Sequence, residues 1–583
     1  MTQQSTLGPK APKDPEKQRK KAYLMLDAAV ESMPRPDGKF AEIIYLEGRV
    51  PAKLKVICPE MPDEICRDLS ISQEFRKMVY AIGVTVTANE EQFRGETVHF
   101  RLDHYGKTNK YESGTRIAAD GLCDGSEIKI MMSGIPENPD DDILGTIYFM
   151  FDHSGIGAKA SVCFYLNDGY DVPEPVLDPP VDFEGDAYRN LIAQSLMSEG
   201  TGEFKARLQE KLARIKKGED LTLAFIGGSI TQGAGAKPQV SMSYAAKTYE
   251  GLKNEFNDPA LRYVKAGVGG TSSEFGIVRY DRDVTADGKI SPDIVVVEYA
   301  VNDAGDETGG VCYESLVRKI LAAPNRPAVV LLFAVFMSDF NLEDRLRPIG
   351  ERYGLPMVSI KSAVTAQFYE ETPVITKRQF FYDIFHPSNE GHKVMTDSLM
   401  NLFKTVAKED FGDAEQKLAE TSAVDVFKGI KCVYGPDFEN MIRADRANLP
   451  EGFSVEEGSF TAQETVLQMA EWDDREMAEP MFTDNWKKDI SEGAEVKPLV
   501  LKGTFSKAIV VYLDSAEQST GKGDIYVDGK FVRTVDPLET GWTHCNTAVA
   551  INEEKAGEHE IMVKLHPGDE GKKFTVLGFG LVL

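Results

Sequence analysis

Short apolar runs that end at glycine or a polar residue organise the middle of the chain. The run LTLAFIG stops at Gly227 and is followed by Gly228 and Ser229, which is typical of a buried parallel strand that delivers a hydroxyl to the end of a sheet. Two later runs end in the same way, LRYVKAGVGG at Gly270 and DIVVVEYAVN at Asn302. Ligands of open α/β sheets bind outside the carboxyl ends of the strands. We therefore expect these three strand ends to converge on one site.

Helical spacing alternates with these strands. Apolar residues recur at helical intervals in EFKARLQEKLARIKKG before the first run, around Tyr244 to Phe256 after it, and from Val394 to Val406 near the end of this region. AVVLLFAV and PMVSI supply two further apolar runs of strand length. The alternation predicts an α/β domain with five parallel strands and helices on both faces.

The flanking regions have a different pattern. From Phe40 to Asn167, seven short segments suggest strands of a sandwich or barrel: FAEIIYLEG, LKVICP, YAIGVTVTAN, ETVHFRLDHY, SEIKIMMSG, GTIYFMFD and ASVCFYLND. DVPEPVLDPPVD then reads as a stiff linker, and the polar first 21 residues as a frayed arm. Strand patterns return after about Val424, with a hairpin tip predicted at VDGK from Val527 to Lys530. We predict three domains, at 1–182, 183–423 and 424–583, the outer two being β-sandwiches or jelly rolls.

Composition narrows the class of protein. The 583 residues carry a formal charge of -27. This argues against nucleic acid or an anionic membrane as partner, because both bind to positively charged protein surfaces. No apolar run approaches the ~20 residues of a membrane span, and no signal-peptide core follows the basic start. Seven cysteines are scattered without metal-ligand spacing. We expect reduced cysteines, no bound metal and a cytoplasmic protein.

A serine, a histidine and an aspartate have the pattern of a hydrolytic triad. A serine hydroxyl is a poor nucleophile at neutral pH and needs a general base, which in turn needs a third group to orient it. In FYDIFHPSNEGH, Asp383 precedes His386 by three residues, so its carboxylate can turn back onto the imidazole within one tight turn. We therefore assign Ser229 as nucleophile, His386 as base and Asp383 as the residue that orients the base.

Attack on an ester produces an oxyanion, which needs donors that are already in place. The candidates are the backbone N–H of Ser229, the backbone N–H of Gly270 and the side-chain amide of Asn302. Two alternatives stay open, because the neighbouring Gly269 is equally able to supply the backbone donor and Asn302 is also a suitable helix cap.

Other residues have a weaker case for a functional role. Glu298 interrupts an apolar strand and needs a buried partner, for which Arg279 is a candidate. Asp303 and Thr231 are candidates for supporting the site. The remaining histidines, His392 included, are interpreted as structural. Three tryptophans offer sugar-stacking rings but are more often core residues, and we leave them out of the site: Trp472, Trp486 and Trp542.

The blocks around Ser229, Gly270, Asn302 and His386, in this order, resemble the GDSL or SGNH hydrolase family, whose name lists these residue types. The resemblance runs from about Leu221 to Phe403. It departs from the family at the aspartate before the serine, here Gly228, and at an asparagine that often opens the second block, here Lys265. The resemblance implies a flavodoxin-like catalytic domain and a serine esterase that needs no cofactor.

The family contains lipases, thioesterases and sugar deacetylases. The GGSIT block and the flanking β domains look most like a bacterial carbohydrate O-acetylesterase that acts on imported, acetylated oligosaccharides. The alternatives are a lipase or thioesterase, and a non-catalytic carbohydrate-binding protein with a vestigial hydrolase domain. A phosphate-binding loop and an α/β-hydrolase fit less well, because GSITQGAGAK matches neither phosphate motif and Thr231 stands where G-x-S-x-G needs glycine. The sequence leaves a homo-oligomer open.

Overall fold

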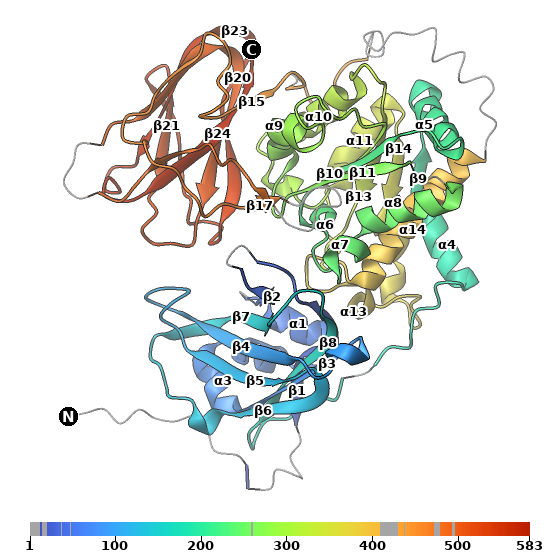
Figure 1. The fold of residues 1–583 in the computed structure, drawn as a ribbon, viewed down its shortest axis with the longest axis vertical. Coiled ribbons are helices and arrows are strands. Elements are labelled where there is room, and N and C mark those ends of the chain that lie inside the picture. The colour runs from blue at the N-terminus through green and yellow to red at the C-terminus, as the bar shows by residue number, and fades with distance from the viewer. Residues whose placement is uncertain are drawn as a thin grey trace. The chain divides into compact units, whose positions relative to one another are not determined.

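The structure is a computed structural model that describes residues 12–13, 20–35, 38–46, 48–175, 177–257, 260–408, 430–435, 438–470, 479–491 and 496–583. The chain forms two compact units (Figure 1). The first comprises Met1–Val181, Gly235–Ser241 and Thr376–Asn389, and the second comprises Asp182–Ala234, Met242–Ile375 and Glu390–Leu583. Within the described ranges, no helix has the length and apolar character needed to cross a membrane.

A six-stranded sheet lies at the centre of the second unit. Its order is β11-β10-β12-β13-β14-β9, and all neighbours are parallel except β9, which runs antiparallel at the edge. The strands are β9 (Leu196–Glu199), β10 (Thr222–Gly227), β11 (Arg262–Gly267), β12 (Ile294–Glu298), β13 (Ala328–Phe333) and β14 (Pro356–Ser359). Because β11 and β12 lie on opposite sides of β10, the winding reverses between β10 and β12, and such a switch point is where ligands bind in open α/β sheets.

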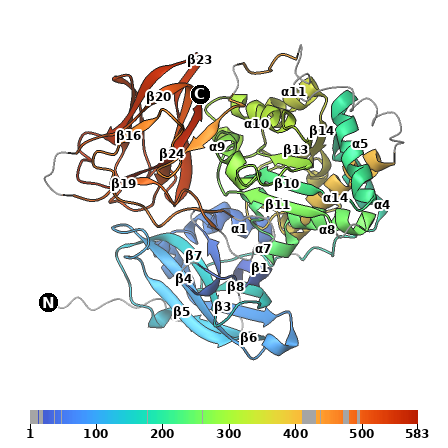
Figure 2. The ribbon, with the colours of Figure 1, turned by 45° about the horizontal axis from the view of Figure 1, so that its top comes forward.

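Helices cover both faces of this sheet. Figures 1 and 2 show α9, α10 and α11 on one side and α5, α8 and α14 on the other. The helices of the second unit, with two that extend into the first, are α4 (Asp186–Gln194), α5 (Gly202–Lys216), α6 (Ser229–Gln232), α7 (Gln239–Met242), α8 (Tyr244–Phe256), α9 (Ser273–Asp283), α10 (Val311–Leu321), α11 (Glu343–Tyr353), α12 (Ile360–Val364) and α14 (Asn389–Ala407). The predicted mixed α/β architecture is confirmed, and β9 is an addition that the sequence pattern did not predict.

The C-terminal strands belong to the same unit as the α/β sheet. They are β15 (Ile442–Ala444), β16 (Ser454–Glu456), β17 (Met469–Ala470), β18 (Glu479–Pro480), β19 (Trp486–Lys488), β20 (Leu499–Asp514), β21 (Gly523–Val527), β22 (Lys530–Val535), β23 (His544–Leu565) and β24 (Phe574–Val582). Val511 of β20 and Leu577 of β24 share one hydrophobic core with Phe275 of α9. Val527 pairs with Lys530 as predicted, and both residues of the tip have positive φ. The expected boundary near residue 423 lies outside the described residues.

The first unit contains two four-stranded sheets that share a core, with orders β1-β8-β3-β6 and β2-β7-β4-β5. The strands are β1 (Lys21–Glu31), β2 (Phe40–Tyr45), β3 (Val79–Ala88), β4 (Thr97–Gly106), β5 (Arg116–Leu122), β6 (Asp124–Met131), β7 (Asp141–Phe151) and β8 (Gly157–Leu166). The unit also holds α1 (Val50–Ile57), α2 (Asp63–Asp68), α3 (Ser72–Met78) and α13 (Lys377–Phe380). Most of the expected N-terminal arm lies outside the described residues.

One predicted strand of this unit is wrong. LKVICP does not form a strand, because most of it belongs to helix α1. The buried residues of α1 are Val50, Lys53, Leu54 and Ile57, which is helical spacing, and Pro51 lies in the first turn, where a helix tolerates proline. The helical period was therefore present in the sequence, and it brings Lys53 into the interior.

Candidate active site

Ser229 begins a one-turn helix at the end of strand β10. The strand is buried from Leu223 to Gly227, and α6 starts directly at Ser229 and ends at Gly233, whose φ of 103° is a left-handed conformation suited to glycine. The main-chain oxygen of Ser229 accepts hydrogen bonds from Gly233 at 3.0 Å and from Ala234 at 2.9 Å. The turn therefore fixes the Ser229 backbone at the switch point of the sheet.

Asn302 lies beside Gly228, across from strand β10. A side chain at Gly228 would collide with the Asn302 amide, whose Cγ lies 2.7 Å from the position that such a Cβ would take. The amide oxygen, Oδ1, is buried and has no hydrogen-bond partner among the described residues. Asn302 precedes a short 3-10 helix (Asp303–Gly305) without a side-chain capping bond. The helix-cap alternative is therefore wrong, and the amide nitrogen remains available for a ligand.

Gly269 and Gly270 form a turn after strand β11. The φ of Gly270 is +74°, which L side chains rarely adopt. A Cβ on Gly269 would lie 3.7 Å from Cβ of Ser229, so this glycine faces the serine. Among the described residues, neither N–H donates to a protein acceptor. Both glycines thus present candidate oxyanion donors, and the choice between them stays open.

Residues of the C-terminal strands reach this turn. The Nε2 atom of Gln468 donates to the main-chain oxygen of Gly269 at 2.6 Å, and its Oε1 accepts from the N–H of Cys545 at 2.7 Å. A Cβ on Gly270 would lie 2.8 Å from the indole of Trp542 and 3.0 Å from Nε2 of His544. The C-terminal strands therefore supply an aromatic ring and an imidazole next to the expected oxyanion site.

Trp542 and His544 have different surroundings. The Trp542 side chain is 37% exposed, whereas His544 is buried and its Nδ1 lies 3.1 Å from Oδ2 of Asp514. Trp542, which the sequence analysis left out of the site, lies beside the glycine turn, and His544 is buried and paired with Asp514, which agrees with its structural interpretation. Trp486 is buried against Phe579, as expected of a core residue, and Trp472 lies outside the described residues. No local sequence pattern around Trp542 or His544 indicates that they lie beside Gly270, because this contact joins segments that are far apart in the sequence.

Thr231 and Glu298 brace the serine turn. The Thr231 hydroxyl lies 2.7 Å from the hydroxyl of Tyr244 and donates to Oε2 of Glu298 at 3.1 Å. Burial raises the pKa of the Glu298 carboxyl to about 7. The expected pairing of Glu298 with Arg279 is wrong, because the Arg279 guanidinium binds Asp283, Tyr299 and the main-chain oxygens of residues 227 and 266.

Asp303 joins two of the three strand ends. Its carboxylate accepts a hydrogen bond from the N–H of Ser273 at 2.7 Å and another from the Ser273 hydroxyl at 2.8 Å. Ser273 begins α9, directly after the glycine turn, and Asp303 follows Asn302. Burial, with a smaller contribution from Asp306, raises the pKa of Asp303 well above its ordinary value. Asp303 thus holds the Asn302 loop to the Gly270 loop, as a supporting residue should.

Asp383 and His386 form a hydrogen-bonded pair in the first unit. Nδ1 of His386 lies 3.0 and 2.9 Å from the two carboxylate oxygens, and the N–H groups of Phe385 and His386 donate to Oδ1 at 2.7 and 2.9 Å. Burial disfavours the charged carboxylate. The charge and hydrogen bond of His386, the charge of Lys53 and the Phe385 N–H outweigh burial and hold the pKa of Asp383 well below its usual range.

The structure gathers the predicted residues into two groups, one in each unit. Ser229, Asn302 and the glycine turn meet at three strand ends of the second unit, and Asp383 and His386 meet in one turn of the first. His392 is buried, accepts a bond from the N–H of Tyr244 and lies 3.1 Å from the main-chain oxygen of Ala234. His392 is therefore structural, as expected.

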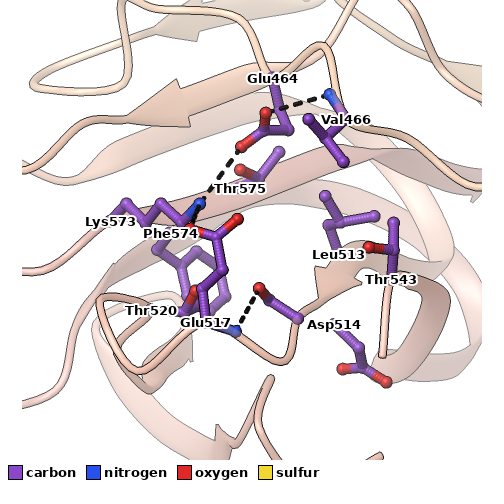
Figure 3. A pocket seen from close by; sticks show the side chains of 11 residues that line it. Glu464, Val466, Leu513, Asp514, Glu517, Thr520, Thr543, Lys573, Phe574 and Thr575 are labelled. Carbon is purple, nitrogen blue, oxygen red and sulfur yellow. Dashed lines mark hydrogen bonds and ion pairs between the residues drawn. The ribbon is translucent and has the colours of Figure 1, made fainter. Parts of the chain in front are cut away.

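A pocket in the C-terminal strands adjoins the residues that reach the glycine turn. Figure 3 shows its lining, which includes Thr543, between Trp542 and His544 in the chain. Its charged groups pair with one another, since Lys573 lies 2.7 Å from Glu517 and 3.9 Å from Glu464. The lining contains no histidine or cysteine. The pocket therefore offers polar contacts to a ligand but no nucleophile with a base.

Comparison with known proteins agrees with the geometry. Residues 225–394 match the model of the GDSL-like Lipase/Acylhydrolase family. A crystal structure of a two-domain esterase (CEX) active on acetylated mannans is similar at 25% identity with a TM-score of 0.52, and the match covers 67% of this chain and 97% of that one. Another structure of such an esterase, co-crystallized with mannopentaose, has 24% identity, a TM-score of 0.51 and coverages of 67% and 99%. No curated protein matches the chain. The resemblance to GDSL hydrolases is confirmed, and with it the class of carboxylic ester hydrolase.

Proposed function

We propose that the protein is a serine esterase that removes O-acetyl groups from carbohydrates. The observation that carries the proposal is the meeting of Ser229, the Asn302 amide and the Gly269–Gly270 turn at the switch point of the sheet, with Trp542 beside them. A nucleophile and oxyanion donors are the parts that acyl transfer needs. Similarity to an esterase active on acetylated mannans supports an acetylated polysaccharide or oligosaccharide as substrate.

In the proposed mechanism, Ser229 Oγ attacks the acetyl carbonyl carbon while His386 takes the hydroxyl proton. The tetrahedral oxyanion receives hydrogen bonds from the Ser229 N–H, the N–H of Gly270 or Gly269, and the Asn302 amide. The intermediate collapses to an acetyl-serine, and the sugar oxygen leaves with the proton from His386. His386 then takes a proton from water as the water attacks, and it returns this proton to Ser229 Oγ as the bond to the acetyl carbon breaks and acetate leaves. Asp383 holds the imidazole in one tautomer throughout, which its bonds to Nδ1 support.

We expect acetyl esters to be cleaved better than longer acyl esters. The loops after the strand ends, GGSITQGAGAKPQVS, GVGGTSSEFG and NDAGDETGG, are rich in glycine and polar residues, so a longer acyl chain gains little of the roughly 0.8 kcal/mol available per buried CH₂. Values of kcat/KM for 4-nitrophenyl acetate, butyrate and octanoate, with acetate release from a panel of acetylated oligosaccharides, measure this. A preference that rises with chain length would favour the lipase or thioesterase alternative instead.

Trp542→Ala should weaken the reaction with oligosaccharides and leave 4-nitrophenyl acetate nearly unaffected. A partly exposed indole beside the oxyanion turn can stack on a sugar ring, and an aromatic contact of about 1 kcal/mol corresponds to a loss of several-fold to tenfold in kcat/KM. Phe531→Ala is the matched control, since Phe531 is an exposed aromatic residue on β22. Equal losses with both substrates would show that Trp542 supports the turn and does not bind sugar.

A further inference from the structure

The turn that carries Asp383 and His386 is attached to the N-terminal β unit. Arg378 donates to the main-chain oxygen of Ile57, the last residue of α1, at 3.0 Å, and it pairs with Asp178 at 2.8 Å. Asn389 exchanges hydrogen bonds of 2.7 Å with the main chain of Lys237, and Lys237 pairs with Glu42 of β2 at 2.6 Å. The acid and base of the proposed triad therefore belong to the same compact unit as the N-terminal strands.

Helix α1 and the residue before it face this turn with two cationic side chains. Lys53 is 6% exposed, and its ammonium lies 4.9 Å from the ring centre of Tyr382, the residue before Asp383. Arg49 lies 4.0 Å from Oδ2 of Asp383, and its guanidinium stacks over the Phe385 ring at 4.9 Å. Both cations thus lie beside residues of this turn, Arg49 against the Asp383 carboxylate and Lys53 against the Tyr382 ring.

The pKa of the Lys53 ammonium depends in turn on the charge of Asp383. Burial lowers the pKa of the Lys53 ammonium, and the charges of Asp383 and Glu42 oppose that effect while Arg49 adds to it. The groups that face the Asp383 turn are Arg49 and Lys53 from the α1 side, Glu42 from β2, Lys237 from Gly235–Ser241, and Tyr382 and His386 from the turn itself. A buried lysine beside a buried carboxylate is costly unless each supports the other.

We propose that Lys53, assisted by Arg49, is a positioning residue that fixes Asp383 against His386, so that the N-terminal β unit is part of the catalytic apparatus. This inference rests on the proposed roles of Asp383 and His386.

Lys53→Met in the full-length protein tests the proposal. We expect kcat for 4-nitrophenyl acetate to fall about tenfold or more with little change in KM, because Asp383 and His386 act on the chemical step. The pKa of the Asp383 carboxyl should rise, because the Lys53 charge is one of the groups that hold it low. Lys53→Arg keeps the charge and should stay closer to the wild type than Lys53→Met.

Lys55→Met is the matched control. Lys55 lies on the same helix, its side chain is 36% exposed and it pairs with Asp63, so its loss should leave kcat and the titration of Asp383 unchanged. Circular dichroism and thermal melting report whether each variant folds. If Lys53→Met does not fold, Arg49→Met takes its place, because Arg49 is partly exposed and should give a smaller shift in the same direction.

Two results would overturn the proposal: wild-type kcat in Lys53→Met, or an unchanged titration of Asp383 in the folded variant. An error in the proposed substrate would be a separate outcome. If the wild type prefers long acyl chains, kcat of Lys53→Met and of the wild type can still be compared with a long-chain ester. If the wild type hydrolyses no ester, the carboxyl carbon signal of Asp383 in aspartate-labelled protein carries the test. It should show protonation at a higher pH in Lys53→Met than in the wild type, and identical titrations would contradict the proposal.

Discussion

Ser229→Ala lowers ester hydrolysis to near background, on the order of 10⁴-fold or more in kcat, and His386→Ala does the same. The nucleophile and the base act in one step, so the loss of either removes that step entirely. For the same reason, the double variant should be no slower than either single variant. Initial rates with 4-nitrophenyl acetate, corrected for spontaneous hydrolysis, measure all three.

His566→Ala is the control for the histidine change. His566 is 42% exposed and lies 2.9 Å from Asp524 in the C-terminal strands. It has no role in the proposed mechanism, so this variant removes an imidazole that the reaction does not use. It should retain wild-type kcat. Substantial turnover by folded Ser229→Ala would rule out the proposed nucleophile, and substantial turnover by His386→Ala would rule out the proposed base.

Asn302→Ala should fold and lose about 10²-fold to 10³-fold in kcat, which is the typical cost of one oxyanion donor. The Asn302 oxygen is buried against Gly228 and makes no hydrogen bond among the described residues, so little folding stability depends on its partners. The amide nitrogen contributes mainly when the oxyanion forms, and KM should therefore change little. Steady-state kinetics with an acetyl ester separates the two parameters.

Asn302→Asp keeps the shape of the side chain and removes the donor. It should lose at least as much kcat as Asn302→Ala, because a carboxylate near the oxyanion adds repulsion to the missing hydrogen bond. A rise in KM at constant kcat in both variants would make Asn302 a substrate-binding residue and remove it from the oxyanion hole.

The sequence predicted the parts of the site that depend on local chain geometry. Strand β10 ends at Gly227, where its apolar run ends, whereas β11 and β12 end three and four residues before Gly270 and Asn302. Parallel pairing brings these strand ends together. The Asp383–His386 pair was predictable because three residues of spacing permit one tight turn. Both predictions depend on local sequence patterns. For the strand ends, one further rule is needed, which is that ligands bind at the carboxyl ends of the strands in an open α/β sheet.

The parts that the sequence did not predict depend on contacts between distant segments. Trp542, His544 and Gln468 reach the glycine turn only because the C-terminal strands share a hydrophobic core with α9. Strand β9 is short and half-buried, so it has no alternation from which to infer a strand. The sequence analysis singled out nothing at Lys53, which is buried next to the Tyr382 ring in the folded chain.

The central claim is that Ser229 carries the acetyl group during the reaction, and peptide mass spectrometry after an acid quench tests it most directly. The full-length protein is mixed with an acetylated mannan oligosaccharide, quenched during turnover and digested. The account predicts an added mass of one acetyl group on the peptide that contains Ser229, which is absent from Ser229→Ala and from protein incubated with the deacetylated sugar. Acetate release without this adduct, or an acetyl group on a different residue that Ser229→Ala does not abolish, would contradict the account.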